Sequence, residues 1–116
     1  MATRLTLRIE FDAERAIGPG KVRLLELIEA HRSIAAAGRA MDMSYRRAWL
    51  LVDSLNRSFK RPVVAAQHGG TAGGGAKLTA FGKTLVEHYR AMESDTEQAV
   101  RKRLRALQRN LRSDAG

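Results

Sequence analysis

The segment from Ser33 to Lys77 constrains the fold more than any other part of the chain. It begins with a short run of small residues, passes through Asp42 and Met43, and continues as an amphipathic run over 44–56. A run typical of a β-strand and a glycine-rich stretch complete it. This order predicts a short helix, a tight turn, a second helix that opens with two arginines, and a basic hairpin. The major groove of duplex DNA accepts one helix, and a basic loop beside that helix can hold the DNA backbone.

Both helices of this segment begin at residues that suit a helix amino terminus. Ser33 and Ser44 each precede a helical run, and a serine hydroxyl accepts a hydrogen bond from a free amide one turn into the helix. Asp42 lies in the turn between the helices, where a positive φ is often needed and a short polar side chain tolerates it. Gly38 costs its helix up to about 1 kcal/mol relative to alanine, which predicts a close crossing with the next helix.

The helix after Ser44 has one apolar and one polar face. A helix advances by about 100° per residue, so four apolar residues form one stripe: Ala48, Leu51, Val52 and Leu55. Four residues lie on the opposite side: Arg46, Leu50, Asp53 and Arg57. Arg47 lies on a flank, so the first turn presents both arginines outward or sideways. Trp49 is expected in the core or at its edge.

Pro62 is expected to end the helical region, and the residues after it predict a β-hairpin. The range 63–68 reads as a strand and 76–78 as its return, with five glycines between them: Gly69, Gly70, Gly73, Gly74 and Gly75. The hairpin corresponds to the wing of a winged helix, and its tip fits close to a sugar–phosphate backbone because no side chain intervenes. A nucleotide-binding loop is the alternative. The Walker pattern ends in Gly-Lys-Ser/Thr, however, and Ala76-Lys77-Leu78 stands here.

The residues before this segment predict a strand and a helix. Apolar residues alternate with polar ones from Leu5 to Phe11, which indicates a strand with one buried face. The segment from Ala16 to Gly20 contains glycine and proline and is expected to separate the strand from the next element. The residues from Lys21 to His31 have apolar side chains at helical spacing, which predicts the first helix.

The last helix, which Thr79 can cap, is long and continues its apolar stripe beyond the expected domain. The stripe supplies the expected dimerisation residues: Leu85, Tyr89, Met92, Val100, Leu104, Leu107 and Leu111. The second half of the helix is strongly basic, and a basic helix with one apolar stripe most often pairs with a copy of itself. The expected fold is mainly α with a small β-sheet. A winged helix-turn-helix occupies 1–79, and a long carboxy-terminal dimerisation helix with a basic tail occupies 80–116.

The amino-acid composition limits the classes of binding partner and argues against an enzyme. The chain of 116 residues has a formal net charge of +9, which favours a polyanionic partner without choosing between DNA, RNA and an anionic membrane. It has no cysteine, and no apolar run approaches the roughly 20 residues that span a bilayer, so a cytoplasmic protein without a membrane partner is expected. Its three histidines are scattered, so we expect no metal site, no catalytic residues and no enzyme.

Several motifs resemble a known family. They are Gly20-Lys21-Val22-Arg23-Leu24-Leu25, Ser33-Ile34-Ala35-Ala36-Ala37, Met43-Ser44-Tyr45-Arg46-Arg47-Ala48-Trp49 and the wing Gly73-Gly74-Gly75-Ala76-Lys77-Leu78-Thr79 with Gly82. Together they resemble the amino-terminal DNA-binding domain of ModE-type molybdate-responsive regulators, which is also related to the LysR-type regulators. Asp42 departs from the glycine that many relatives carry, and the strand before the wing is less charged than expected.

The resemblance implies a homodimer whose third helices enter successive major grooves of double-stranded DNA, with the wings on flanking backbone. It also implies that the first strand and the last helix join the subunits. Full-length relatives carry carboxy-terminal oxyanion-binding domains. We therefore expect no cofactor in this chain, with any molybdate sensing done by a separate domain or a separate oxyanion-binding protein.

The candidate DNA-binding residues lie on the third helix, at the start of the second and in the wing. Arg46 and Arg47 offer guanidinium forks that match guanine, although contact with phosphate alone is as plausible for either. Tyr45 has phosphate contact and packing as alternatives, and a base-stacking role is the less favoured alternative for Trp49. The full candidate set is Ser33, Ser44, Tyr45, Arg46, Arg47, Arg57, Gly73, Gly74, Gly75 and Lys77.

The function expected from the sequence is a sequence-specific transcription regulator that binds double-stranded DNA as a homodimer and is linked to molybdate or oxyanion metabolism. Two alternatives stay open. A winged helix can serve as a protein-interaction module, with the last helix as its functional surface. The basic chain could also be a non-specific nucleoid-type or RNA-binding protein.

Overall fold

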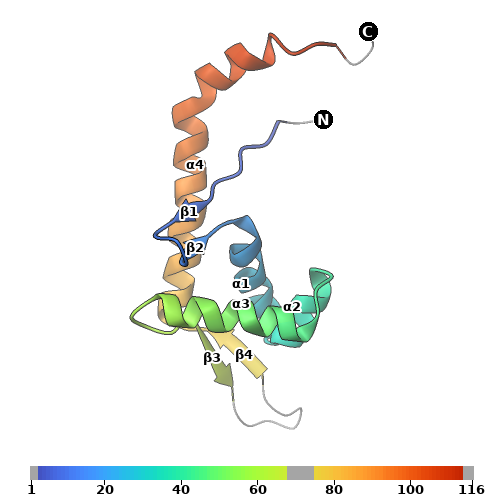
Figure 1. Cartoon of the computed structure of the whole chain (residues 1–116), viewed down its shortest axis with the longest axis vertical. Helices are drawn as coiled ribbons and strands as arrows, with labels where there is room; N and C mark the ends of the chain where they lie inside the picture. Colours follow the sequence, from blue (N-terminus) through green and yellow to red (C-terminus); the bar gives the residue numbers. More distant parts are fainter. Residues whose placement is uncertain (1–2, 68–74, 114–116) are drawn as a thin grey trace.

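The computed structural model describes residues 3–67 and 75–113 and has the predicted fold class, a mainly α winged helix-turn-helix with two small antiparallel sheets (Figure 1). The elements in chain order are β1 (Ile9–Glu10), β2 (Ala16–Ile17), α1 (Pro19–His31), α2 (Ile34–Ala40), α3 (Tyr45–Ser58), β3 (Val64–Gln67), β4 (Gly75–Leu78) and α4 (Ala80–Gln108). The helix α3 ends at Ser58, before Pro62, so the proline lies in the connection to the wing.

One hydrophobic core joins the three short helices, the base of the wing and the start of α4. Its members are Ile17, Val22, Leu24, Leu25, Ile28, Ala37, Ala48, Val52, Leu55, Val63, Val64, Ala76, Leu78, Leu85 and Tyr89. The predicted stripe of α3 points into it, since Ala48, Val52 and Leu55 are buried and Leu51 is half-buried. Burying these side chains is the main force that fixes the orientation of α3, and it leaves the opposite face of the helix free.

Local contacts confirm the predicted caps of α2 and α3 and the predicted turn between them. The Ser33 hydroxyl accepts from the Ala36 amide at 3.0 Å, and the Ser44 hydroxyl accepts from the Arg47 amide at 3.1 Å. Asp42 has a φ of 56°, in the left-handed region that the turn was expected to need. A Cβ at Gly38 would lie 3.0 Å from the Cβ of Ala48, so the two helices cross closely there, as predicted.

The wing is an antiparallel pair in which Val64 lies opposite Leu78 and Gln67 opposite Gly75. Its base is tied to the start of α4, because the Thr79 amide donates to the Val63 carbonyl at 3.0 Å. The same carbonyl lies only 2.2 Å from where a Cβ at Gly82 would stand, so this approach requires glycine. The predicted tip glycines Gly69, Gly70, Gly73 and Gly74 lie outside the described residues.

The amino-terminal region differs from its prediction. Leu5, Leu7 and Ile9 are half-buried and alternate with exposed polar residues, but only β1 forms a strand within the predicted range, and Phe11 is exposed. β1 pairs with β2, which lies where a chain interruption was predicted. The chain instead turns around Asp12, whose carboxylate accepts from the amides of Glu14 and Arg15. A pair of strands this short supplies few hydrogen bonds, so side-chain packing and this turn hold the segment.

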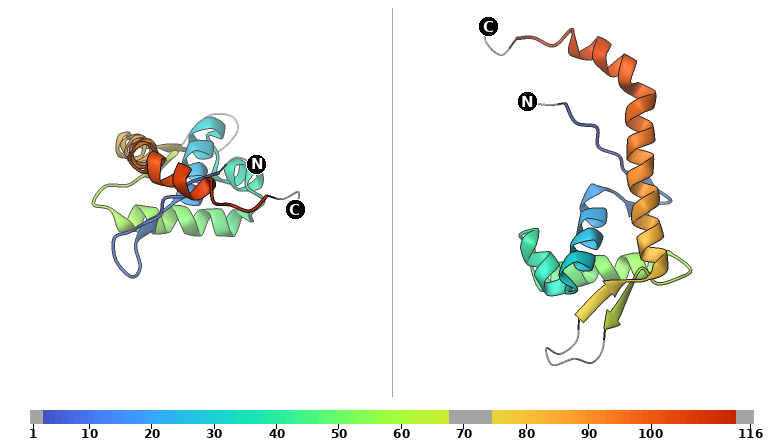
Figure 2. Two further views of the ribbon diagram at one scale, coloured as in Figure 1. Left: turned by 90° about the horizontal axis from the view of Figure 1, so that it is seen from above. Right: turned by 180° about the vertical axis from the view of Figure 1, so that it is seen from behind.

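The inner and outer parts of α4 have different surroundings. Thr79 caps the helix by accepting from the Gly82 amide at 2.9 Å, and the inner turns pack on the core through Leu85 and Tyr89. The Tyr89 hydroxyl donates to the Leu7 carbonyl at 2.6 Å, which fixes the amino-terminal segment on α4. Figure 1 and the right view of Figure 2 show the outer turns extending away from the domain. The expected boundary after Thr79 thus falls within one packed unit.

Across the described ranges, none of the helices has both the length and the continuous apolar character needed to cross a lipid bilayer.

Candidate nucleic-acid interface

The first turn of α3 presents two arginines to solvent. Arg46 and Arg47 are both exposed, and the Ser44 cap fixes the backbone that carries them. Within residues 3–67 and 75–113, neither guanidinium pairs with an acidic side chain. Two uncompensated cations on a helix whose other face is buried form a fixed site for an anionic partner.

Arg57 lies on the same outward face of α3 but has a partner. Its Nε donates to the Asp53 carboxylate at 3.0 Å, one helical turn earlier. An exposed pair of this kind contributes little to stability, so Arg57 can exchange Asp53 for a phosphate at small cost. We therefore keep Arg57 as a secondary candidate after Arg46 and Arg47.

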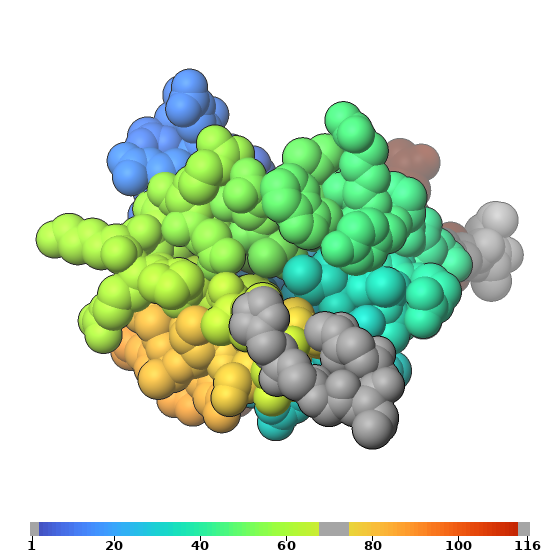
Figure 3. All heavy atoms as spheres, turned by 90° about the horizontal axis from the view of Figure 1, so that it is seen from below, coloured from blue at the N-terminus to red at the C-terminus, as the bar shows by residue number. Residues whose placement is uncertain are grey.

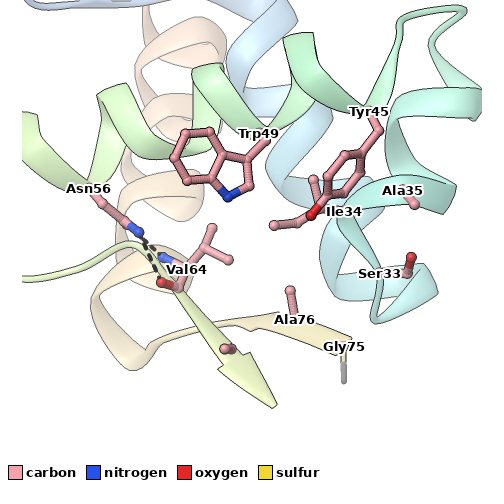
Figure 4. Close-up of a pocket in the computed structure, with 10 residues that line it drawn as sticks. Ser33, Ile34, Ala35, Tyr45, Trp49, Asn56, Val64, Gly75 and Ala76 are labelled. Carbon is pink, nitrogen blue, oxygen red and sulfur yellow. Dashed lines mark hydrogen bonds between the residues drawn. The ribbon is translucent and has the colours of Figure 1, made fainter. Parts of the chain in front are cut away.

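Two aromatic residues of α3 lie on the flank that faces the wing. Tyr45 is 59% exposed and Trp49 is 46% exposed. The prediction that Trp49 lies in the core or at its edge is therefore wrong. The core stripe of α3 is completed by Val52 and Leu55, and the wing that borders Trp49 does not cover it (Figure 4). Periodicity within α3 could not reveal whether another element would cover Trp49.

A hollow of about 490 Å³ lies between this flank, the start of α2 and the base of the wing (Figure 4). Its described lining residues are Ser33, Ile34, Ala35, Tyr45, Trp49, Asn56, Val64, Ala66, Gly75 and Ala76. Figure 3 views the molecule from the side of the wing, where α3 (green to lime) and α2 (cyan) border the wing base. The hollow brings together Ser33, Tyr45 and Gly75 from the candidate set.

Asn56 fixes the wing against α3 and was not identified from the sequence. Its side-chain oxygen accepts from the amides of Val63 and Val64 at 2.7 and 3.0 Å, and its amide donates to the Val64 carbonyl at 3.1 Å. These three bonds orient the wing relative to α3. A polar residue on the flank of an otherwise amphipathic helix was the available signal.

The second strand of the wing is held from the other side by α1. The Ala76 amide donates to the Arg32 carbonyl at 3.1 Å, and a Cβ at Gly75 would lie 2.6 Å from that oxygen. Gly75 is thus required for the close approach of backbone to backbone inside the protein. Lys77 is exposed on the same strand. Gly73 and Gly74 of the candidate set lie outside the described residues.

The expected dimerisation residues divide into two groups. Leu85 and Tyr89 are buried in the core of their own chain, so they are not available to a second copy. Met92, Leu107 and Leu111 are exposed, and Val100 and Leu104 are half-buried. A contact between copies would therefore rest on the other four residues of α4 and on Leu111, which lies beyond the end of the helix at Gln108.

The described part of the chain contains no group of three or more histidine, cysteine, aspartate or glutamate side chains that could hold a metal ion.

Comparison with known proteins gives several relatives. The chain is 37% identical to the molybdenum transport protein ModE of Azotobacter vinelandii over 101 residues, which cover 85% of this chain and 37% of that protein. It is 40% identical to the molybdenum-pterin-binding protein MopB of Rhodobacter capsulatus over 98 residues, covering 84% and 35%. It is 28% identical to the DNA-binding transcriptional dual regulator ModE of Escherichia coli K12 over 89 residues, covering 77% and 34%.

The chain spans about a third of the length of these curated relatives. No family model matches it.

Proposed function

Because this chain is a member of the ModE-type family of molybdate-responsive regulators over the length of one domain, we propose that it is a transcription regulator that binds double-stranded DNA sequence-specifically as a homodimer. The relative from Escherichia coli is named a DNA-binding transcriptional dual regulator. The proposal transfers that role to this chain on the strength of the shared domain and of the geometry of α3.

One observation carries the proposal: the guanidiniums of Arg46 and Arg47, which pair with no acidic side chain among the described residues, project from the first turn of a helix whose opposite stripe is buried. A helix about 10–12 Å across fits the major groove, which is about 12 Å wide, and its amino-terminal residues then meet base edges. Asn56 holds the wing beside the helix, where Lys77 can contact flanking phosphate. The formal charge of +9 adds non-specific attraction to the duplex.

The homodimer is supported by the outer part of α4. Leu107 is largely exposed on a helical stripe that continues from Met92, and Leu111 is exposed just beyond the end of the helix at Gln108. A second copy would cover these leucines and place a second α3 on the duplex. Two half-sites about one helical turn apart would then be read together.

The link to molybdenum is proposed from the names of the relatives. ModE of Azotobacter vinelandii is named a molybdenum transport protein, and MopB is named a molybdenum-pterin-binding protein. We propose that this chain acts in molybdate or oxyanion metabolism and that sensing belongs to a separate domain or protein. Calorimetric titration of the 116-residue chain with molybdate and tungstate should then show no binding, and tight binding would contradict this assignment.

DNA binding is tested with single alanine variants of the two arginines. At least one of Arg46→Ala and Arg47→Ala should weaken binding to a preferred duplex by about 1–3 kcal/mol and relax the preference at one base position. Arg23→Ala is the matched control, because it removes one exposed positive charge from α1. Fluorescence polarisation of labelled duplexes over a range of salt concentrations gives affinity and salt dependence together.

The outcomes separate the alternatives. Affinity should fall steeply with salt because several cations displace counterions. If both variants kept the affinity and preference of the unmodified chain, the recognition-helix assignment would be wrong. Salt-dependent binding without any sequence preference would indicate a nucleoid-type protein. Absence of duplex binding at low salt would leave the protein-interaction and RNA-binding roles.

A further inference from the structure

One wall of the hollow beside α3 is formed by two aromatic side chains that are not part of the hydrophobic core. Trp49 and Tyr45 stand one helical turn apart, and both are about half exposed. The indole nitrogen of Trp49 lies on the side of its ring that faces the hollow, and the Tyr45 hydroxyl points toward the start of α2 (Figure 4). Among the described residues, neither polar group has a protein hydrogen-bond partner. Large amphipathic side chains that the fold leaves half exposed are suited to binding.

The charges around the hollow favour an anionic occupant. None of its described lining residues is acidic. The two elements that line the hollow each carry an exposed cation next in sequence to a lining residue, Arg46 on α3 and Lys77 on β4. An apolar floor with donor groups on its wall, between elements that carry exposed cations, matches a ligand that has an apolar ring and an anionic group.

The position of Tyr45 and Trp49 on the flank of α3 indicates which ligand with an apolar ring and an anionic group would occupy the hollow. If the outward face of α3 occupies the major groove, the helix nearly fills the groove, because both are about 12 Å wide. A residue on a flank then faces one of the two walls of the groove, and each wall is a sugar–phosphate strand. Trp49 lies on the flank toward the wing (Figure 4), so in this arrangement it would face the DNA strand that passes between α3 and the wing.

We propose that this hollow binds the sugar–phosphate backbone of one strand of duplex DNA, with Trp49 as the central contact residue. The indole face covers an apolar deoxyribose, and the indole N–H donates to a phosphate oxygen. The Tyr45 hydroxyl donates to the same backbone one helical turn earlier. This inference rests on the proposed DNA-binding function and adds a backbone contact to it, alongside the base contacts of Arg46 and Arg47.

The chain contains one tryptophan, so its fluorescence reports on this hollow alone. Excitation at the red edge of tryptophan absorption avoids both DNA and tyrosine. On titration with duplex, Trp49 emission should shift or be quenched, and its accessibility to acrylamide should fall. Polarisation of a labelled duplex in the same samples reports binding independently of the tryptophan.

Substitutions then separate the roles of the ring and the donor. Trp49→Phe keeps an aromatic ring and loses the donor, so affinity should fall about tenfold, the effect of one hydrogen bond to a charged group. Trp49→Ala should cost more than Trp49→Phe. Because a phosphate contact carries no sequence information, the loss should be equal for preferred and random duplexes, and the salt slope should not change. Phe11→Leu, which removes another exposed aromatic ring outside the hollow, should bind normally.

The outcomes distinguish this inference from the proposed function. If duplex binds but Trp49 emission and accessibility stay constant, and Trp49→Phe binds normally, the backbone site is overturned and the DNA-binding function stands. If Trp49→Phe changes the base preference instead, Trp49 reads bases and the assignment is also overturned. Stronger protection of Trp49 by single-stranded DNA than by duplex would replace it with base stacking. If the chain binds no duplex, the proposed function fails and the inference fails with it.

Discussion

The inner and outer parts of α4 have the same spacing of apolar residues, but the inner part is buried in the domain and the outer part is exposed. The inner turns, 80–90, are fixed by the wing base at Gly82, by the core at Leu85 and by the amino-terminal segment at Tyr89. In the outer turns, 98–108, no residue is buried, and Leu107 is 68% exposed. An apolar stripe therefore indicates that a helix will be covered without indicating whether its own chain or a partner covers it.

The largest effect is expected at the innermost contact of α4. In Gly82→Ala the new Cβ would stand 2.2 Å from the Val63 carbonyl, which also accepts from the Thr79 amide and cannot move freely. Overpacking of this kind should lower the free energy of unfolding by about 3 kcal/mol, measured by urea denaturation. Gly20→Ala is the control, since nothing lies within 4 Å of the position that its new Cβ would take, and it should be neutral or slightly stabilising. Equal stability of the two variants would contradict the close approach.

Substitutions in the outer part of α4 should change the oligomeric state of the chain and leave the stability of the domain unchanged. The double variant Leu104→Glu with Leu107→Glu places charges on the stripe, so the proposed homodimer should dissociate in sedimentation experiments while the domain stays folded. DNA affinity should fall on the order of a hundredfold, because the second half-site is no longer bound by a linked subunit.

The control for this variant adds the same charges to the other side of the helix. Gln98→Glu with Ala106→Glu should leave the dimer intact. A sedimentation coefficient that is unchanged by the substitutions at Leu104 and Leu107 would assign the interface to another surface or show that the unmodified chain is a monomer.

A smaller effect is expected where α4 holds the amino-terminal segment. Tyr89→Phe removes the hydroxyl that donates to the Leu7 carbonyl at 2.6 Å and should destabilise the chain by about 1 kcal/mol. Tyr45→Phe removes an exposed hydroxyl that has no partner in the described chain, so the free energy of unfolding should not change. Equal losses in thermal or urea unfolding would show that the Leu7 contact contributes nothing.

These contrasts show what the sequence could and could not predict. Rules that act within a few residues were sufficient for the caps at Ser33 and Ser44 and for the positive φ at Asp42. They were also sufficient for the buried stripe of α3, because helical periodicity depends only on the helix itself.

The errors arose where the outcome depends on a distant element. Trp49 is exposed because the wing borders it without covering it, and Tyr89 is a core residue because the amino-terminal segment returns to it across most of the sequence. Asn56 was missed for the same reason, since its partners belong to the wing. Side-chain patterns within one helix contain no information on which element will lie against each flank.

The smallest effect is expected at the turn between β1 and β2, which is exposed throughout and forms a contrast to the buried hydroxyl of Tyr89. The Arg15 side chain, which donates to the Asp12 carboxylate at 2.7 Å, and the amides of Arg15 and Glu14 lower the pKa of Asp12 from 3.8 to about 2. Because the folded-state pKa is depressed, these contacts stabilise the chain above the unfolded pKa, and their contribution is lost as the pH falls from 3.8 toward 2. Titration of Asp12 by NMR should give this value, and Arg15→Ala should raise it toward 3.8, whereas Arg8→Ala, whose side chain bonds Glu10, should not. An Asp12 that titrates near 3.8 in the unmodified chain would show that the turn is not held by these bonds in solution.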